Sequence, residues 1–266
     1  MEDSAVARLL PPGTRTIRLF TAPEVASGAV SVPGWEDAGM QLVKLRSRGR
    51  AVVGNGVFLK EYIYRSRWDR FRQRFKTPRP FVSLDAARRL TELGIPTPRV
   101  LVAARGIAPD GDIRDLLVTE QLPSDVVFGD REIRTLTGMP LPLVAVVLKM
   151  HDGGVCHGDL SLRNWYSTPE GEWGLIDLDG ATVGKAVSKR LRTDELARLV
   201  SSWLCAKDGY HGTLAGLRQY SQNLADEYTK LGGAVDRRRL EKRSIYLANR
   251  FRVKYLKMDP VLDKLK

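Results

Sequence analysis

The sequence predicts an α+β fold in two lobes, with a small sheet-rich lobe followed by a helical lobe. Three observations carry this prediction. Short apolar strands dominate residues 40–123, and one pair of them meets at Gly54-Asn55-Gly56. A single stretch of helical periodicity interrupts these strands at residues 81–94. Helical patterns dominate from residue 141 onward, and strands that precede helices in this way are typical of segregated elements rather than alternating β-α units.

The length, charge and cysteine count of the chain limit the size of its fold and the kinds of partner that it can bind. It has 266 residues, a formal net charge of +12 and two cysteines. The length suits two lobes with sizeable cores. The basic balance favours an anionic partner, such as nucleic acid, anionic lipid or a phosphorylated substrate. The cysteine count argues against a disulfide framework or a metal cluster, and we expect neither a signal peptide nor a membrane span because the apolar runs are short.

The N-terminal half divides into two parts. Residues 1–39 are rich in Gly, Pro and Ser, and we expect them to be loosely ordered or to cap the fold. Residues 40–123 form the predicted N-lobe. Asn-Gly between apolar runs is the strongest short signal for a hairpin. The elements expected in this lobe are a strand at 40–47, a hairpin at 51–64, the helix at 81–94 and a strand at 115–123.

Residues 124–266 form the predicted C-lobe. Thr193 or Asp194 is the expected N-cap of its second helix, because Thr and Asp side chains accept hydrogen bonds from the first backbone amides of a helix. The elements expected in this lobe are helices at 141–154, 193–205 and 236–257, and a strand within 171–181.

The stretch Val-Cys-His-Gly-Asp-Leu-Ser-Leu-Arg-Asn-Trp at 155–165 carries the chemistry. Phosphoryl transfer needs a base near the attacking hydroxyl, ligands for Mg²⁺ and a cation on the nucleotide phosphates. Asp159, Asn164 and Asp177 supply the base and the ligands in chain order, and Lys60 closes an apolar strand upstream. Taken alone, each of these residues could equally be part of a polar turn or a solvent-exposed charged side chain. Their order and spacing together indicate a phosphotransferase.

The segments Met-His-Asp-Gly-Gly-Val-Cys-His-Gly-Asp-Leu-Ser-Leu-Arg-Asn-Trp-Tyr-Ser-Thr and Gly-Leu-Ile-Asp-Leu-Asp-Gly-Ala-Thr resemble the bacterial lipopolysaccharide kinase family. The resemblance covers about residues 40–205. It implies a protein-kinase-like fold and an ATP- and Mg²⁺-dependent enzyme that phosphorylates a hydroxyl of Kdo or heptose in the lipopolysaccharide inner core.

The resemblance also implies roles for single residues. Asp159 would orient or deprotonate the acceptor hydroxyl, and Asn164 and Asp177 would hold Mg²⁺. Lys60 would contact the α- and β-phosphates of ATP, with Asp85, ahead of Glu92, as its acidic partner. The role of Asp179 stays open between the substrate or metal shell and the cap of a turn. The backbone groups of the hinge would meet adenine at Glu120, Gln121 and Leu122.

The sequence differs from those of protein kinases in three places, and these differences argue against a kinase that acts on peptides. Residues 41–56 contain no Gly-x-Gly-x-x-Gly. Gly158 stands where most protein kinases have an Arg that reads a phosphorylated activation loop, so we expect no such switch. No Ala-Pro-Glu follows Asp177, which argues against a platform for peptide substrates.

Other functions stay open at this point. Small atypical protein kinases of the RIO or tRNA-modification-associated type also use His-Gly-Asp, but they usually keep Asp-Phe-Gly. Aminoglycoside-type phosphotransferases tend to have acidic pockets, which suit this basic chain poorly. A pseudokinase that only binds nucleotide would fit the same fold, although the intact Lys60, Asp159, Asn164 and Asp177 argue against it.

The basic surface predicts the partners. Arginines and lysines crowd residues 44–79 and the helix at 236–257. We expect them to meet a lipid A-linked acceptor at an anionic membrane surface, which places the enzyme in the bacterial cytoplasm, peripheral at the cytoplasmic face of the inner membrane. Nucleic acid is the alternative, because Trp68, Phe71 and Phe75 lie among the arginines as stacking residues do.

Overall fold

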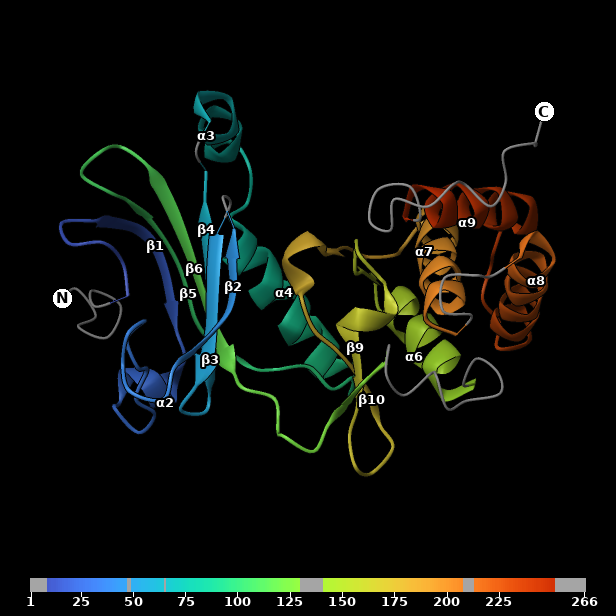
Figure 1. The fold of residues 1–266 in the computed structure, drawn as a ribbon, viewed down its shortest axis with the longest axis horizontal. Helices are drawn as coiled ribbons and strands as arrows, with labels where there is room; N and C mark the ends of the chain where they lie inside the picture. Colours follow the sequence, from blue (N-terminus) through green and yellow to red (C-terminus); the bar gives the residue numbers. More distant parts are fainter. Residues whose placement is uncertain (1–8, 47–48, 65, 130–140, 208–212, 252–266) are drawn as a thin grey trace. The chain divides into compact units, whose positions relative to one another are not determined.

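The structure is a computed structural model, and it describes residues 9–46, 49–64, 66–129, 141–207 and 213–251 (Figure 1). The chain forms two compact units. The N-terminal unit comprises Met1–Ala87 and Pro98–Ser124, and the C-terminal unit comprises Arg88–Thr97 and Asp125–Lys266. No helix in the described ranges has the length and apolar character that crossing a bilayer requires.

The N-terminal unit is built on a six-stranded antiparallel sheet. Its edge-to-edge order is β1-β5-β6-β4-β3-β2. Asn55 and Gly56 turn the chain between β3 and β4 with φ angles of 50° and 78°, so the predicted hairpin is confirmed. The strands are β1 (Arg15–Thr21), β2 (Gln41–Arg46), β3 (Gly49–Gly54), β4 (Val57–Ile63), β5 (Val100–Ile107) and β6 (Ile113–Glu120).

Strand β1 lies within the segment that we expected to be loosely ordered or to cap the fold. It pairs with β5 from Arg15 opposite Ile107 to Thr21 opposite Val102, and the short helix α2 (Pro23–Ala26) follows it. Leu9, Leu10 and Val25 join the core under the sheet. The described part of this segment therefore adds an edge strand to the sheet, and its few apolar residues pack into the core.

Two helices follow β4. Helix α3 (Arg67–Arg74) begins after Ser66, whose side chain accepts a hydrogen bond from the Asp69 amide, and no residue of α3 is buried. Helix α4 (Arg79–Glu92) covers the predicted helix at 81–94 except for its last two residues, and it buries Phe81, Leu84 and Leu90. The last part of α4 belongs to the C-terminal unit, where the Arg89 guanidinium donates to the carbonyl of Gly153 at 2.9 Å.

The C-terminal unit is mainly helical (Figure 1). Its helices α7 and α9 pack together, and both contact α8. Between the helices lie short strands, which pair as β7-β9-β10 and β8-β11. The elements are β7 (Val127–Phe128), α6 (Leu141–Asp152), β8 (Val155–Cys156), η1 (Leu162–Asn164), β9 (Trp165–Ser167), β10 (Trp173–Leu175), η2 (Leu178–Gly180), β11 (Thr182–Val183), α7 (Lys189–Lys207), α8 (Leu214–Lys230) and α9 (Arg237–Phe251).

The start of α7 differs from our prediction. The helix begins at Lys189, and the Ser188 side chain accepts a hydrogen bond from the Leu191 amide at 3.3 Å. Thr193 lies inside the helix, where its hydroxyl donates to the Lys189 carbonyl at 2.7 Å. Neither Thr193 nor Asp194 is the cap, because Ser188 offers the same chemistry one turn earlier. The predicted end of the last helix, at residues 252–257, lies outside the described residues.

Candidate active site

The loop between β8 and η1 presents the predicted base. Asp159 lies on this loop with its side chain 33% exposed. Its two carboxylate oxygens meet two arginines: Oδ2 accepts from Arg163 at 3.0 Å and Oδ1 from Arg198 at 2.8 Å. The carboxylate is thus accessible to a substrate and surrounded by positive charge.

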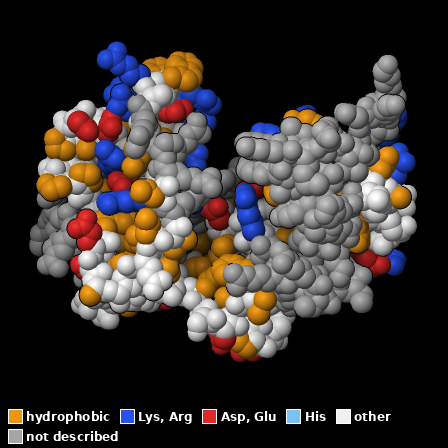
Figure 2. All heavy atoms as spheres, viewed as in Figure 1, with side chains coloured by type: hydrophobic (Ala, Val, Ile, Leu, Met, Phe, Trp, Pro, Cys, Tyr) orange, Lys and Arg blue, Asp and Glu red, His pale blue; other side chains and the backbone are white. Residues whose placement is uncertain are grey.

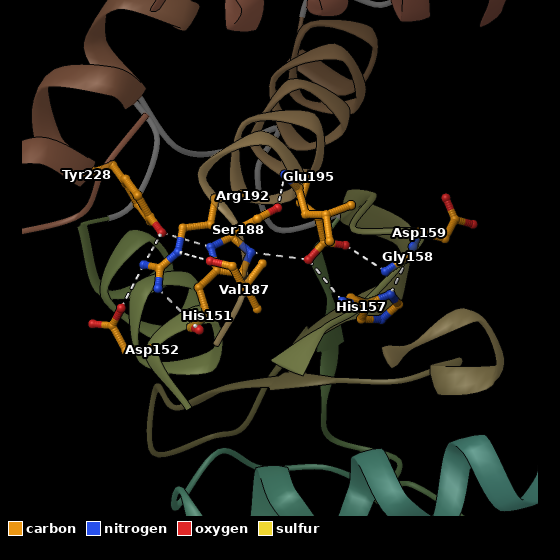
Figure 3. Close-up of polar contacts among 11 residues, drawn as sticks. His151, Asp152, His157, Gly158, Asp159, Val187, Ser188, Arg192, Glu195 and Tyr228 are labelled. Atoms are coloured by element: carbon orange, nitrogen blue, oxygen red, sulfur yellow. Dashed lines mark hydrogen bonds and ion pairs between the residues drawn. The ribbon is translucent and has the colours of Figure 1, made fainter. Parts of the chain in front are cut away.

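A buried carboxylate on α7 fixes the backbone of this loop. Glu195 is 5% exposed. Its Oε2 accepts from the His157 amide at 2.9 Å, and its Oε1 accepts from the Gly158 amide at 2.6 Å (Figure 3). Two consecutive amides immediately before Asp159 are therefore bound to one side chain, which limits how far the Asp159 backbone can move.

A chain of polar contacts behind Glu195 keeps it ionised. The His151 Nε2 lies 3.2 Å from Glu195 Oε2, and its Nδ1 lies 2.8 Å from the Tyr228 hydroxyl, to which Arg192 donates (Figure 3). Burial raises the pKa of Glu195, but the hydrogen bond and charge of His151, together with His157, outweigh it and the pKa lies below its ordinary value. The network joins α6, α7 and α8 to the loop.

His157 connects this loop to the segment of Asp177. Its Nδ1 accepts from the Asp159 amide at 3.3 Å, and its Nε2 lies 2.9 Å from the Ile176 carbonyl. Because Nδ1 accepts, the proton is on Nε2 and is donated to that carbonyl. The Ile176 amide in turn donates to the Asn164 carbonyl at 2.9 Å. Asp177 therefore follows a residue that is bound on both sides to the loop of Asp159 and Asn164.

The donor set of Asn164 and Asp177 fits Mg²⁺. The Asn164 Nδ2 donates to the Asp159 carbonyl at 2.8 Å, which leaves the amide oxygen as the atom that could bind a cation. Asp177 adopts a left-handed conformation with φ 60° and ψ 54°, which is uncommon for a residue other than glycine and frequent at functional sites. Carboxylate and amide oxygens are ligands that Mg²⁺ accepts.

The described ranges contain no group of three His, Cys, Asp or Glu residues arranged to hold a metal ion.

Gly158 is required by its surroundings. Its φ is +81°, and a Cβ at this position would lie 2.2 Å from the carbonyl oxygen of Gly180 in the turn after Asp177. A side chain would therefore push the two loops apart.

The pairing of Cys156 with Thr182 holds the same two segments together. Burial raises the pKa of the Cys156 thiol to about 12, assisted by the nearby Glu195 carboxylate, so this cysteine is a packed group rather than a nucleophile.

Of the remaining predicted residues, Lys60 and Asp85 lie in the N-terminal unit, and Glu92 lies in the part of α4 that belongs to the C-terminal unit. Lys60 lies on the central strand β4, opposite Ala51 and Leu117 of its neighbours, with its Nζ 5.0 Å from the centre of the Tyr62 ring. Asp85 is exposed on α4. Glu92, the weaker candidate for the acidic partner, is paired with Arg89 at 2.8 Å. Which acid accompanies Lys60 stays a prediction.

The predicted hinge follows β6. The Glu120 amide donates to the Arg99 carbonyl at 3.0 Å, and the Gln121 amide donates to the Gly56 carbonyl at 2.9 Å. Two of the three hinge donors thus bind backbone carbonyls next to the strands, so the Leu122 amide is the one to consider for a nucleotide base.

Comparison with known proteins identifies the family of the chain. The model of the lipopolysaccharide kinase (Kdo/WaaP) family matches residues 46–226. The chain belongs to this family. It is therefore a kinase that acts on lipopolysaccharide sugars, and our predictions of the family and of a phosphotransferase with a sugar hydroxyl as acceptor are confirmed. A comparison with curated protein sequences found no match.

Solved structures show the same fold. "WaaP in complex with acyl carrier protein" aligns with a TM-score of 0.52 and 21% identity over 87% of this chain and 99% of that one. "Glucosamine kinase in complex with glucosamine, ADP and inorganic phosphate" aligns with a TM-score of 0.51 and 13% identity over 90% of this chain and 80% of that one. The predicted α+β, protein-kinase-like fold class is thereby confirmed.

The structure also reveals residues that the sequence analysis of this lipopolysaccharide kinase missed. Glu195, Arg163 and Arg198 all contact the loop of Asp159. The sequence analysis expected a helix to begin at Thr193 or Asp194, but it assigned no role to Glu195. Arg163 stands next to Asn164 in the motif and could have been singled out by its position.

Proposed function

We propose that the chain transfers the γ-phosphoryl group of ATP to a hydroxyl of Kdo or heptose in the inner core, with Asp159 as the base. The observation that supports this most is the rigid frame around the loop. Glu195 binds the two amides before Asp159, and Ile176 binds the Asn164 carbonyl. Both contacts lie within the C-terminal unit, and they support the proposal because they tie together the backbone segments that carry Asp159, Asn164 and Asp177.

The reaction is a displacement at phosphorus. The acceptor hydroxyl gives its proton to an oxygen of Asp159, and its own oxygen forms a bond to the γ-phosphorus. The bond from phosphorus to the bridging oxygen breaks, and ADP leaves with the electron pair. The Asn164 amide oxygen and the Asp177 carboxylate would hold Mg²⁺, which supplies positive charge to the phosphate oxygens.

The N-terminal unit would bind the nucleotide. Lys60 is proposed to contact the α- and β-phosphates, with Asp85 as the first candidate for its acidic partner. The Leu122 amide is proposed as the donor to adenine within the hinge Glu120–Leu122. The glucosamine kinase of similar fold was solved with ADP and inorganic phosphate, which supports ATP as the phosphoryl donor here.

Helix α3 offers a surface for an anionic membrane. Apolar side chains gather on α3 with basic ones beside them (Figure 2). Trp68, Phe71 and Phe75 are 65%, 51% and 77% exposed, and their rings follow one another with centres 5.8 and 5.2 Å apart. Exposed aromatics flanked by arginines are typical of helices that lie in a membrane interface.

We therefore place the enzyme at the cytoplasmic face of the bacterial inner membrane, bound reversibly, where a lipid A-linked acceptor is presented. Each Lys or Arg near an anionic surface contributes about 1 kcal/mol. Of the four arginines of α3, Arg70 is paired with Asp112, and Arg67, Arg72 and Arg74 supply this charge.

The test of the proposed function is mass spectrometry of lipid A–core acceptors incubated with the protein and Mg-ATP. We expect one sugar to gain one phosphate, and none to gain it when ATP is omitted. Binding of nucleotide and Mg²⁺ without transfer to any sugar would support a binding module instead. Transfer to protein side chains alone would support an atypical protein kinase.

A further inference from the structure

The two arginines beside Asp159 raise a question about the acceptor. Arg163 and Arg198 each bind a different oxygen of the same carboxylate. A guanidinium group carries only donors and stays charged. It can therefore neither accept the proton of an acceptor hydroxyl nor pass it on. Each Asp159 oxygen keeps a further lone pair that can receive the hydroxyl proton, so the two guanidinium groups lie next to the place where the acceptor would bind.

One face of α7 builds this arrangement. Glu195, Arg198 and Ser202 lie three and four residues apart, so they share a helix face. Glu195 binds the amides of His157 and Gly158, Arg198 binds the Asp159 carboxylate, and Ser202 accepts from the Leu162 amide at 3.1 Å. The last contact fixes η1, which carries Arg163. Both arginines are thus placed by contacts that also fix the loop.

We infer that Arg163 and Arg198 form an anion-binding subsite for the acceptor sugar, which recognises a carboxylate or phosphate close to the hydroxyl that is phosphorylated. This inference rests on the proposed function and names the acceptor class for it. Each guanidinium group has five N–H donors, and the contacts with Asp159 use one of each. The anion binds through the other donors and places the hydroxyl beside Asp159, which accepts its proton.

Three properties support the acceptor as the source of this anion. Both arginines contact Asp159, the residue that faces the acceptor hydroxyl, and not the amide of Asn164, whose nitrogen is bound to the Asp159 carbonyl. The side chains of Arg163 and Arg198 are 62% and 38% exposed, so both can reach a ligand. Planar guanidinium groups match the two oxygens of a carboxylate or phosphate.

The subsite predicts a preference that can be measured. A hydrogen bond to a charged group contributes about 1.5–3 kcal/mol, which corresponds to about 10- to 100-fold in affinity. We expect the wild-type protein to prefer an anionic acceptor over its neutral analogue by a factor in this range or above.

The experiment compares kcat/KM for matched acceptors. One pair is a sugar acid with a free carboxylate and its methyl ester, and the other is a lipid-linked acceptor with and without its phosphate groups. The pair that shows the preference identifies the anion as a carboxylate or a phosphate. The variants are Arg163→Gln and Arg198→Gln, and the control is Arg218→Gln, which removes an exposed arginine that binds Glu241 on α9 at 2.8 Å.

Each arginine variant should lose about 10- to 100-fold of the preference and keep its KM for ATP, and Arg218→Gln should keep the preference. An equal loss with anionic and neutral acceptors would overturn the inference, because the arginines would then act on Asp159 or the γ-phosphate alone. So would a wild-type protein without any preference.

Calorimetric binding of the same acceptors without ATP separates the inference from the proposed function. If the wild-type protein phosphorylates no sugar but binds the anionic acceptor through both arginines, the proposed function fails and the subsite stands. If it phosphorylates sugars while Arg163→Gln and Arg198→Gln bind both acceptors of each pair as the wild type does, the subsite fails and the proposed function stands. The melting temperatures of both variants check that they fold. Arg163 is the more exposed of the two arginines, so its replacement should disturb the fold less.

Discussion

Replacing Glu195 by Gln should destabilise the protein and disorder the loop of Asp159. Both oxygens of Glu195 accept hydrogen bonds, Oε1 from Gly158 at 2.6 Å and Oε2 from His157 at 2.9 Å. In the variant, one of these positions becomes an NH₂ group that faces a backbone N–H. A hydrogen bond to a charged group contributes about 1.5–3 kcal/mol, and a buried donor left without a partner costs about 1–3 kcal/mol. We expect a loss of about 3 kcal/mol in the free energy of unfolding.

The assays are thermal unfolding and steady-state kinetics. At about 2–4 °C per kcal/mol, the melting temperature should fall by about 6–12 °C, and kcat should fall with it because Asp159 is no longer held in place. Glu227→Gln is the control. It breaks the ion pair with Lys230 on the surface of α8 at 2.7 Å and should change the unfolding free energy by about 0.5 kcal/mol or less.

The pH dependence provides a further check on Glu195. The pKa of this carboxyl is lowered in the folded state, so its contribution to stability is present above the ordinary Glu pKa of about 4.3 and is lost as the pH falls through the folded value. The difference between wild type and Glu195→Gln should therefore shrink in acid. A variant with an unchanged melting temperature and unchanged kcat at neutral pH would refute the role of Glu195 as the anchor of the loop.

Two further predictions concern the metal and the membrane. Asp177→Asn should raise the Mg²⁺ concentration needed for half-maximal rate and lower kcat far more than Asp179→Asn, because the first carboxylate is the proposed ligand; equal effects would place the metal ligand elsewhere. Replacing Arg67, Arg72 and Arg74 by Gln should weaken co-sedimentation with anionic liposomes by on the order of 100-fold at low salt, at about 1 kcal/mol per arginine, and leave the KM for ATP unchanged. Liposome binding that changes neither with salt nor with these substitutions would contradict the membrane proposal. Tight, salt-sensitive binding to RNA would favour nucleic acid as the partner instead.

Local signals in the sequence were enough for much of the fold. Asn55-Gly56 between apolar runs can hardly form anything but a tight hairpin, and the apolar spacing of residues 81–94 matches one face of a helix. Strand β1 was harder to recognise, because Gly- and Pro-rich sequence surrounds it. Its partner β5 is far away in the chain, and pairing between distant segments leaves no local pattern.

The same reasoning applies to the site. His157, Asp159 and Asn164 stand in one short motif, so their spacing, together with Lys60 and Asp177, predicts them as site residues. Glu195 acts on that motif from a separate helix, through hydrogen bonds to backbone amides that any residue possesses. A buried carboxylate of this kind is recognisable only when the tertiary structure shows its burial and its partners.

The most direct test of the central claim is the Asp159→Ala variant, studied by turnover and by ATP binding in parallel. If Asp159 is the base, kcat with a lipopolysaccharide core acceptor should fall by about 10²- to 10⁴-fold. The Kd for ATP should stay close to that of the wild-type protein, because Asp159 faces the acceptor rather than the nucleotide. A variant that keeps near-normal turnover would contradict the assignment of the catalytic loop.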